Sequence, residues 1–235
     1  MYIIYLLIIM FIICYLNNKR QMYSKDMSLY QIYNLKMCQC RMTRMLYILN
    51  KICNKYNIQY WCIGGTLIGV LRHRGWVPWD GDVDLGIFEE DYAKLSKVIQ
   101  NELPNDLWFQ DKIVDKRYKS HLGKIRDTRS SYTDYNDDPW HNGLQVDFFK
   151  FTKSKGIAYS IDNQYKLDTI LPIKRGKFEG FDISIPNKPH EYIALSYKDY
   201  MSIPPRDKRV PHEGNMVYNY VCPQMKKKYP ELYNK

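Results

Sequence analysis

An alternating run of acids constrains this chain more than any other feature: Asp80, Asp82 and Asp84 lead directly into the apolar stretch 85–88. Side chains of a strand point alternately to its two faces, so we predict that these three carboxylates share one face while Val83 points into the core. Like charges side by side repel one another unless a cation neutralises them. Clustered carboxylate oxygens suit a hard divalent cation, so the run predicts a Mg²⁺ or Mn²⁺ site.

A second isolated acid lies in the largely apolar stretch 144–149, where Val146 and Phe148 flank Asp147. An aspartate in such a strand costs free energy unless a metal ion or a polar partner compensates its charge. The alternative is an aspartate on an edge strand, hydrated by water. We keep Asp147 as a candidate catalytic residue.

Upstream of both acidic stretches, Gly64, Gly65 and Thr66 join a predicted strand, 58–63, to a predicted helix, 66–72. Glycines allow backbone N–H groups to approach a phosphate, and the N-terminus of the helix adds a favourable dipole. Alone, such a triplet is also typical of an ordinary turn. The order glycine turn, carboxylate pair and third carboxylate is that of the nucleotidyltransferase fold, in which a metal bridges donor phosphates. We therefore predict that this turn binds substrate.

The composition narrows the choice of partners. The 235 residues carry a formal net charge of +10 at pH 7, which favours an anionic partner such as a nucleotide, a phosphate-bearing substrate or an acidic membrane surface. We find no basic strand with interleaved aromatic residues and no recognised nucleic-acid module, so nucleic acid is not an expected partner. The six cysteines include no CxxC pair and predict neither a zinc knuckle nor a disulfide framework.

The N-terminal segment 1–16 is unbroken apolar or aromatic, and Lys19 and Arg20 follow it. As a helix it would rise roughly 24 Å, a little less than the ~30 Å hydrocarbon core of a bilayer. A cleaved signal peptide would have a positive n-region and small residues at the cleavage site, and the segment has neither. We therefore predict an uncleaved, single-pass membrane anchor at 1–16, a helical juxtamembrane stem at 17–39 and a catalytic domain at 40–235. The two basic residues favour a cytoplasmic domain but leave the side of the membrane open.

Hydrophobic periodicity in the rest of the chain alternates between helix and strand. Apolar residues recur at three- and four-residue steps from 28 to 57, which predicts a long helix with one packed stripe. The further predicted elements are strands at 83–88, 107–114, 121–127 and 144–151, helices at 89–100 and 191–197, and a hairpin after 169. This order indicates an α+β (mixed α/β) domain with a nucleotidyltransferase-like sheet and flanking helices.

A longer pattern surrounds these residues. Residues 64–84 read GGTLIGVLRHRGWVPWDGDVD and resemble the signature of the LicD/fukutin-related family. The resemblance spans about residues 40–210 and continues through VDF at 146–148, FEGFDISIP at 178–186 and YKDYMSIPP at 197–205. Two positions depart from the family: Gly81 stands where many members have another acid, and Lys198 stands where a glycine is common.

The resemblance implies a nucleotidyltransferase-like fold and a LicD-like phosphotransferase. Such an enzyme moves phosphocholine, ribitol phosphate or glycerol phosphate from a CDP-activated donor to a glycan hydroxyl and releases CMP. Carried onto this sequence, Asp82, Asp84 and Asp147 are the expected metal ligands, and Asp80 is a further active-site acid. Either Asp147 or Asp80 is expected to take the proton of the acceptor hydroxyl. The donor alcohol and the acceptor stay open.

Four basic residues near the acids are candidate substrate ligands. Arg72 either pairs with donor phosphate or the carboxylates, or forms an ion pair that only shapes its loop. His73 either carries a proton or makes a structural hydrogen bond. Lys124 and Arg126 share one face of a predicted strand, where they either meet phosphate or lie on the surface. Four tryptophans are candidate platforms for a base, with core packing as the expected use: Trp61, Trp76, Trp79 and Trp140.

Two other functions fit part of the pattern. The same fold can transfer a nucleoside monophosphate from an NTP to a small molecule or an RNA end, with release of pyrophosphate. Alternatively, the chain is an inactive, membrane-bound binding or virion protein. Retention of all four aspartates argues against this alternative, because a protein without catalysis has no need of clustered negative charge. Nucleotide preference and metal binding separate the three functions.

Overall fold

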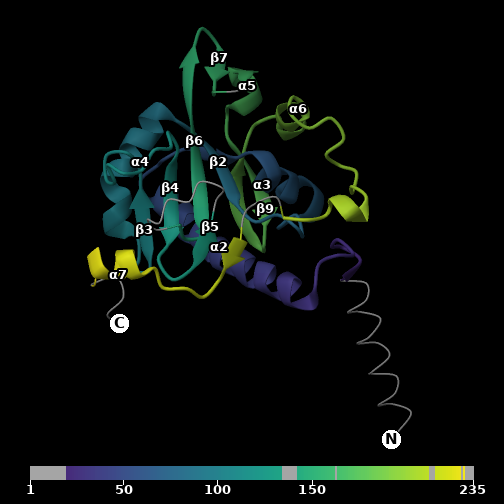
Figure 1. The fold of residues 1–235 in the computed structure, drawn as a ribbon. Coiled ribbons are helices and arrows are strands. Elements are labelled where there is room, and N and C mark those ends of the chain that lie inside the picture. Colours follow the sequence, from purple (N-terminus) through teal and green to yellow (C-terminus); the bar gives the residue numbers. More distant parts are fainter. Residues whose placement is uncertain (1–19, 134–141, 162, 212–214, 229, 231–235) are drawn as a thin grey trace, which may run out of the picture.

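The computed structural model describes residues 20–133, 142–161, 163–211, 215–228 and 230. The predicted anchor at 1–16 and Trp140 lie outside these residues. Among the helices that the structure describes, none is long and apolar enough to cross a membrane. The described chain forms a mixed sheet with flanking helices, as the sequence predicts (Figure 1).

The central sheet brings the two acidic stretches side by side. Its main strands follow the order β1 (Tyr60–Cys62), β2 (Val83–Phe88), β6 (Gln145–Ser154), β4 (Gly123–Asp127) and β3 (Leu107–Gln110). Strands β2 and β6 run parallel, and the other neighbours are antiparallel. Beyond these, β6 also pairs with β7 (Ile157–Tyr159), which pairs with β8 (Gln164–Lys166). Because β2 and β6 are parallel neighbours, both strands begin at the same end of the sheet. Asp84 and Asp147 lie at this end.

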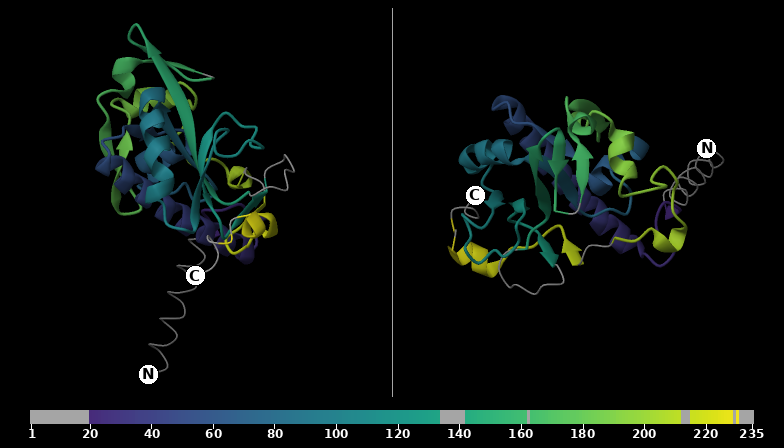
Figure 2. Two further views of the ribbon diagram at one scale, coloured as in Figure 1. Left: turned by 90° about the vertical axis from the view of Figure 1, so that its left-hand side faces the viewer. Right: turned by 90° about the horizontal axis from the view of Figure 1, so that it is seen from above.

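Helices α2 (Leu29–Lys55) and α4 (Glu89–Glu102) pack on one face of the sheet (Figure 2). α2 begins close to the predicted position, because the Ser28 hydroxyl accepts a hydrogen bond from the backbone of Gln31 and the Gln31 side chain accepts one from the backbone of Ser28. Its stripe of Leu, Met and Cys side chains is buried in the core. The helix crosses residue 40 without a break.

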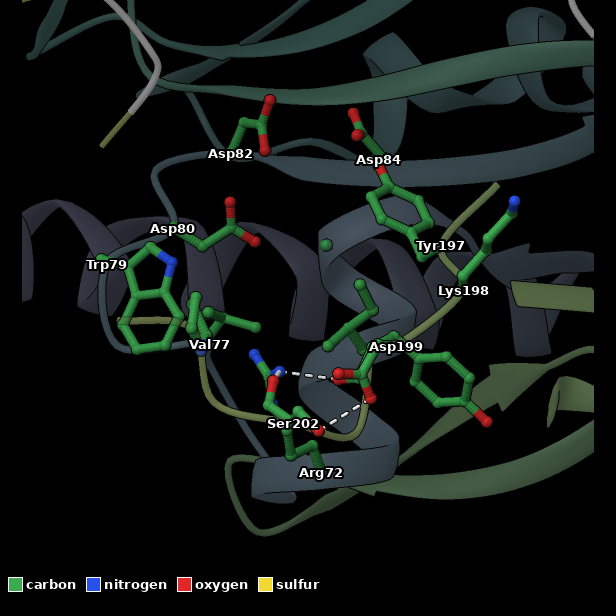
Figure 3. Close-up of a pocket in the computed structure, with 14 residues that line it drawn as sticks. Arg72, Val77, Trp79, Asp80, Asp82, Asp84, Tyr197, Lys198, Asp199 and Ser202 are labelled. Atoms are coloured by element: carbon green, nitrogen blue, oxygen red, sulfur yellow. Dashed lines mark hydrogen bonds between the residues drawn. The ribbon is translucent and has the colours of Figure 1, made fainter. Parts of the chain in front are cut away.

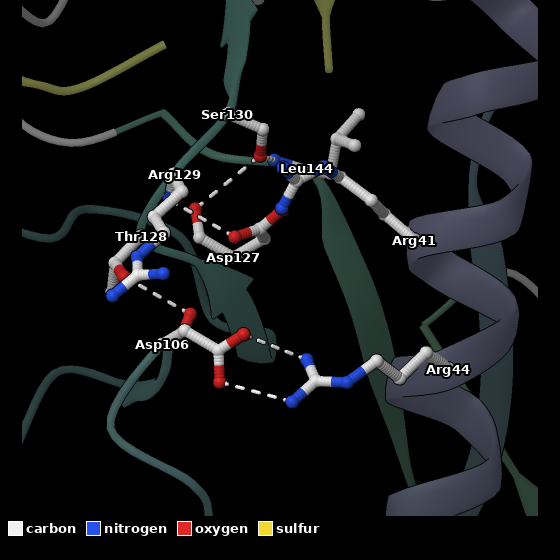
Figure 4. A network of polar contacts seen from close by, with 8 residues as sticks. All are labelled: Arg41, Arg44, Asp106, Asp127, Thr128, Arg129, Ser130 and Leu144. Carbon is white, nitrogen blue, oxygen red and sulfur yellow. Dashed lines mark hydrogen bonds and ion pairs between the residues drawn. The ribbon is translucent and has the colours of Figure 1, made fainter. Parts of the chain in front are cut away.

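Two ion pairs tie α2 to the edge of the sheet (Figure 4). Arg44 donates two hydrogen bonds, of 2.8 and 3.1 Å, to the carboxylate of Asp106, which precedes β3. Arg41 donates one of 2.9 Å to the buried carboxylate of Asp127 at the end of β4. These contacts fix β4, the strand that carries Lys124.

The remaining elements surround the sheet. Helix α3 (Gly64–Ile68) passes directly into a π-helical turn, η1 (Gly69–His73), so the helix predicted at 66–72 is present but begins earlier. The predicted hairpin consists of β9 (Lys174–Phe178) and β10 (Phe181–Ile185). The other elements are α5 (Leu167–Ile170), α6 (Pro189–Ala194), η2 (Arg206–Lys208), the paired strands β5 (Ser131–Thr133) and β11 (Asn215–Val217), and α7 (Pro223–Lys228).

The acidic run differs from its prediction. β2 begins at Val83, so Asp80 and Asp82 lie in the preceding loop and not on one face of a strand with Asp84. The prediction of a shared strand face was therefore wrong for these two residues. A turn replaces the expected extension, closed by a hydrogen bond of 3.0 Å from the Asp80 N–H to the carbonyl of Val77.

Strand β3 is also shorter than the predicted 107–114. It ends at Gln110, because the carboxylate of Asp111 accepts the backbone N–H groups of Ile113 and Val114 and turns the chain. A local side-chain bond thus outcompetes the apolar pattern of this segment.

Candidate active site

A cavity of about 410 Å³ lies beside the first residues of β2 and the helix α3. Asp80, Asp82 and Asp84 line one part of it, and Tyr197 and Arg72 also belong to its wall (Figure 3). The three carboxylates therefore face one space, although only Asp84 belongs to a strand. The structure brings together the acids that the sequence singles out.

Negative charge concentrates around Asp84. Asp84 and Asp147 are direct partners in the parallel register of β2 and β6. Burial raises the pKa of Asp84 well above its ordinary value, and the charges of Asp82, Asp147 and Asp80 raise it further, against the opposing effect of Lys124. A cation bound here would relieve this repulsion.

The glycine turn lies directly under these acids. Gly64 has a φ of +50°, in the left-handed region that glycine adopts without strain. A Cβ added at Gly65 would lie 2.3 Å from Oδ2 of Asp80, and one added at Gly64 would lie 3.2 Å from Oδ2 of Asp84. The Thr66 hydroxyl accepts a hydrogen bond of 2.9 Å from the backbone N–H of Asp84. The turn thus packs closely against the carboxylates of Asp80 and Asp84. Its contact with donor phosphate stays a prediction.

Lys124 neutralises the fourth acid. Its Nζ lies 2.6 Å from Oδ2 of Asp147, its partner in the register of β4 and β6. Lys124 is 7% exposed and Asp147 5%, so surface placement is the wrong alternative for Lys124. β6 lies inside the sheet, so the edge-strand alternative for Asp147 is wrong as well. Burial lowers the pKa of Lys124, against the opposing effect of Asp147.

Arg126 is buried too, and surface placement is wrong for it. Its Nε donates a hydrogen bond of 2.9 Å to Gln110, and its Nη1 donates to the carbonyl of Gly143 at 3.1 Å and to the side chain of Gln145. These bonds join β3, β4 and β6. Arg126 is not among the residues that line the cavity, and its contact with phosphate stays a prediction.

The chemistry of this group fits a divalent cation. Oδ1 of Asp147 is buried and has no hydrogen-bond partner among the described residues, while its Oδ2 accepts from Lys124 and Gln145. Burial is the main cause of the raised pKa of Asp84, and the negative charges around it, which the protein compensates only in part, add to the shift. In the described part of the chain, no three Asp, Glu, His or Cys side chains already enclose a metal position. The ligand set Asp82, Asp84 and Asp147 therefore stays a prediction.

Arg72 binds the loop 197–204, which forms another part of the cavity wall. Its Nη1 donates hydrogen bonds to the carbonyls of Tyr200, at 2.6 Å, and Ser202, at 2.7 Å. Its guanidinium also lies 5.8 Å from the centre of the Trp79 ring. The geometry favours the alternative in which Arg72 shapes the loop, and it does so through carbonyl oxygens in place of the expected ion pair.

We expect Arg72→Lys to loosen this loop, because an ammonium group cannot reproduce the planar fork of a guanidinium. A hydrogen bond from a charged group contributes about 1.5–3 kcal/mol, and loss of one would raise amide hydrogen exchange across 197–204 about tenfold or more. Arg74→Lys, at an exposed neighbour, is the matched control and should leave exchange unchanged. Unchanged exchange with weaker donor binding in Arg72→Lys would instead support a phosphate ligand.

His73 is uncharged at neutral pH. Burial and the charges of Arg72 and Lys36 lower its pKa to about 4. Its Nδ1 accepts a hydrogen bond of 3.4 Å from Nε of Arg72, and its ring meets Trp79 edge-on, with centroids 6.3 Å apart. An imidazole with so low a pKa is a weak base at neutral pH, so the structural hydrogen bond is favoured over a role as proton carrier.

The tryptophans separate into two groups. Trp61 packs between Phe88 and Phe151, with ring centroids 4.9 Å from each. Trp76 is buried in the same core, so core packing is confirmed for both. Trp79 lines the cavity and is the described tryptophan that remains a candidate platform for a base.

The loop 197–204 also belongs to the site, although no local pattern in the sequence predicts its position there. Tyr197, Lys198 and Asp199 line the cavity from this loop. Burial raises the pKa of Tyr197, and the charge of Asp84 raises it further, so its phenol stays protonated. The signal was present in the sequence, because the family-like signature includes this loop and Lys198 departs from it.

A family model described as "LicD/FKTN/FKRP, nucleotidyltransferase domain" matches residues 57–188. This span is narrower than the predicted 40–210. It contains the glycine turn, the acids of the cavity and Asp147, and it ends before the loop 197–204.

Named relatives agree with this match. Lipopolysaccharide cholinephosphotransferase LicD of Haemophilus influenzae is 23% identical over an alignment of 250 residues, gaps included. The alignment covers 71% of this chain and 91% of the relative. Ribitol 5-phosphate transferase FKRP of Homo sapiens is 25% identical over 142 residues, which cover 60% of this chain and 28% of the relative. Ribitol-5-phosphate transferase FKTN of Homo sapiens is 27% identical over 167 residues, which cover 68% of this chain and 33% of the relative. The chain thus spans most of LicD and about a third or less of the two human transferases. Since the family model matches more than half of the chain, the chain belongs to the LicD/FKTN/FKRP family and carries its nucleotidyltransferase domain.

Proposed function

We propose that this chain is a metal-dependent phosphotransferase that moves phosphocholine or a phospho-alditol from a CDP-activated donor to a glycan hydroxyl and releases CMP. The observation that carries the proposal is the group of three carboxylates, Asp80, Asp82 and Asp84, on one cavity beside Asp147. The relatives are named as a cholinephosphotransferase and ribitol phosphate transferases, which supports a LicD-like phosphotransferase and these two classes of transferred group.

In the proposed reaction the acceptor hydroxyl oxygen bonds to the donor phosphorus that carries the alcohol. The bond from that phosphorus to the bridging oxygen breaks, and CMP leaves with the electron pair. Mg²⁺ or Mn²⁺ held by Asp82, Asp84 and Asp147 would neutralise charge on the pyrophosphate. We assign the hydroxyl proton to Asp80, because this carboxylate lines the cavity whereas Oδ2 of Asp147 already accepts from Lys124.

We also propose that the segment 1–16 anchors the chain in a membrane, on a side that the sequence leaves open. Its apolar sequence followed by Lys19 and Arg20 supports this proposal. The acceptor glycan would then be a glycoconjugate within reach of that membrane.

Thermal stabilisation of the full chain by a panel of CDP-linked donors and NTPs, each with and without Mg²⁺ or Mn²⁺, tests the function. A ligand at ~100 times its Kd stabilises by roughly 2.7 kcal/mol, a readily measured shift. We expect metal-dependent stabilisation by a CDP compound, absent in Asp82→Asn, and CMP release once acceptor is added. Preference for an NTP with release of pyrophosphate would identify nucleotidyl transfer instead. No response to metal or nucleotide would contradict both enzymes.

A further inference from the structure

A basic surface forms where the described chain begins. It consists of two segments far apart in the sequence, 20–25 and 204–209, which lie side by side in both Figure 1 and Figure 2. The basic side chains that define this surface are Arg20, Lys25, Arg206, Lys208 and Arg209. A pocket of about 350 Å³ opens in it, lined by Arg20, Gln21, Lys25 and Arg206.

Hydrogen bonds to the backbone hold the two segments together. Nε of Arg206 donates to the carbonyl of Tyr23 at 3.1 Å, and Nη1 of Arg209 donates to the carbonyl of Gln21 at 2.7 Å. The backbone N–H of Ser24 returns a bond of 3.1 Å to the carbonyl of Arg209. Tyr23 is 4% exposed and Ser24 0%, so the contact is packed. The fold therefore fixes the guanidinium groups of Arg206 and Arg209 and holds the backbone of the two segments together.

Basic residues outnumber acidic ones in the two segments of the basic surface. Within the described residues, none of the five forms an ion pair with a carboxylate. The acids in or next to the two segments are Asp26 and Asp207. Like charges held close together repel one another, and an anion bound between them removes that cost.

Exposed apolar side chains flank the segment 204–209 in the sequence. Met201 is 50% exposed, Ile203 47% and Val210 41%. Basic groups beside exposed apolar groups are typical of a surface that enters the headgroup region of an anionic bilayer. The basic surface also follows the apolar sequence 1–16 within a few residues. A soluble phosphate ligand would explain the cations but not the apolar side chains.

We infer that the basic surface binds the anionic headgroups of a membrane, with a lipid phosphate in the pocket of Arg20, Lys25 and Arg206. The loop that ends in this surface begins in the catalytic cavity, whose wall includes Tyr197 and Pro204. Membrane contact therefore holds this wall of the cavity at the bilayer surface. The inference does not depend on which group the enzyme transfers.

Hydrogen exchange of the full chain in lipid nanodiscs tests this inference, which rests on the proposed anchor at 1–16, because that anchor would insert equally in both kinds of disc. We expect amides of 20–25 and 204–209 to exchange several-fold more slowly in discs that contain phosphatidylglycerol than in discs of phosphatidylcholine alone. High salt should remove the difference, since exposed charges are screened. Arg20→Gln/Lys25→Gln should abolish it. Lys226→Gln/Lys227→Gln, on α7 away from the basic surface in Figure 1, removes equal charge and should preserve it.

Three results would overturn the inference. Equal exchange in the two kinds of disc would exclude anionic lipid as the partner. Loss of the difference in the α7 variant as well would mean that overall charge, not this surface, is responsible. Protection by soluble glycerol phosphate in neutral discs, equal to that in anionic discs, would assign the pocket to a free phosphate.

Discussion

Asp84→Asn is expected to abolish group transfer while raising the stability of the metal-free protein. Asparagine has nearly the shape of aspartate, so the change removes charge and little else. Burial of the charge and its repulsion by the neighbouring acids, which together raise the pKa of Asp84, disappear with it. Removing such strain at a functional site typically stabilises by about 0.5–2 kcal/mol. Loss of a metal ligand should reduce kcat by about 10³-fold or more.

Thermal denaturation and the rate of CMP release measure the two effects on one preparation. Asp168→Asn is the matched control, because Asp168 is exposed and its ion pair with Lys188 lies outside the cavity. A surface pair contributes about 0–1 kcal/mol, so this variant should keep both stability and rate near those of the wild type. Full metal-dependent activity in Asp84→Asn would remove Asp84 from the mechanism.

The sequence predicts the fold best where a local pattern and tertiary packing agree. β2 spans the predicted 83–88, because all of its residues except Asp84 are apolar or glycine and its neighbours β1 and β6 pair with both of its edges. α2 and the hairpin β9–β10 follow their patterns for the same reason. Asp80 departs because a turn replaces the strand before Val83, and alternation of residue types alone does not reveal such a turn.

The candidate site shows the other limit of sequence reasoning. The sequence singles out the acids, but it does not show that Lys124 is the register partner of Asp147, because that pairing depends on which strands are neighbours. Nor does it show that Arg72 binds carbonyls 128 and 130 positions away. Both facts are tertiary. The first excludes surface placement of Lys124, and the second favours the alternative in which Arg72 shapes its loop.

Lys124→Met is expected to destabilise the protein by about 3–5 kcal/mol, because it leaves a buried carboxylate without its partner. The cost should be at the upper end of this range, since Asp147 would then lie beside Asp84 without the ammonium group that pairs with it. Urea denaturation measures the loss. Lys112→Met, at an exposed position, is the control and should change stability by about 0.5 kcal/mol or less.

A second substitution separates lost charge pairing from lost packing. If the unpaired charge of Asp147 causes the defect, Lys124→Met/Asp147→Asn should recover at least half of the stability, and the double-mutant cycle should give a coupling energy of about 1–3 kcal/mol. If lost packing causes it, the double variant should be no more stable than Lys124→Met. Mn²⁺ should stabilise Lys124→Met more than the wild type, because a cation beside Asp84 and Asp147 replaces the missing positive charge, and should not do so in the double variant. Equal Mn²⁺ stabilisation in all three proteins would mean that Asp147 is not a metal ligand, which leaves Lys124 and Asp147 as a structural pair beneath a site held by Asp82 and Asp84.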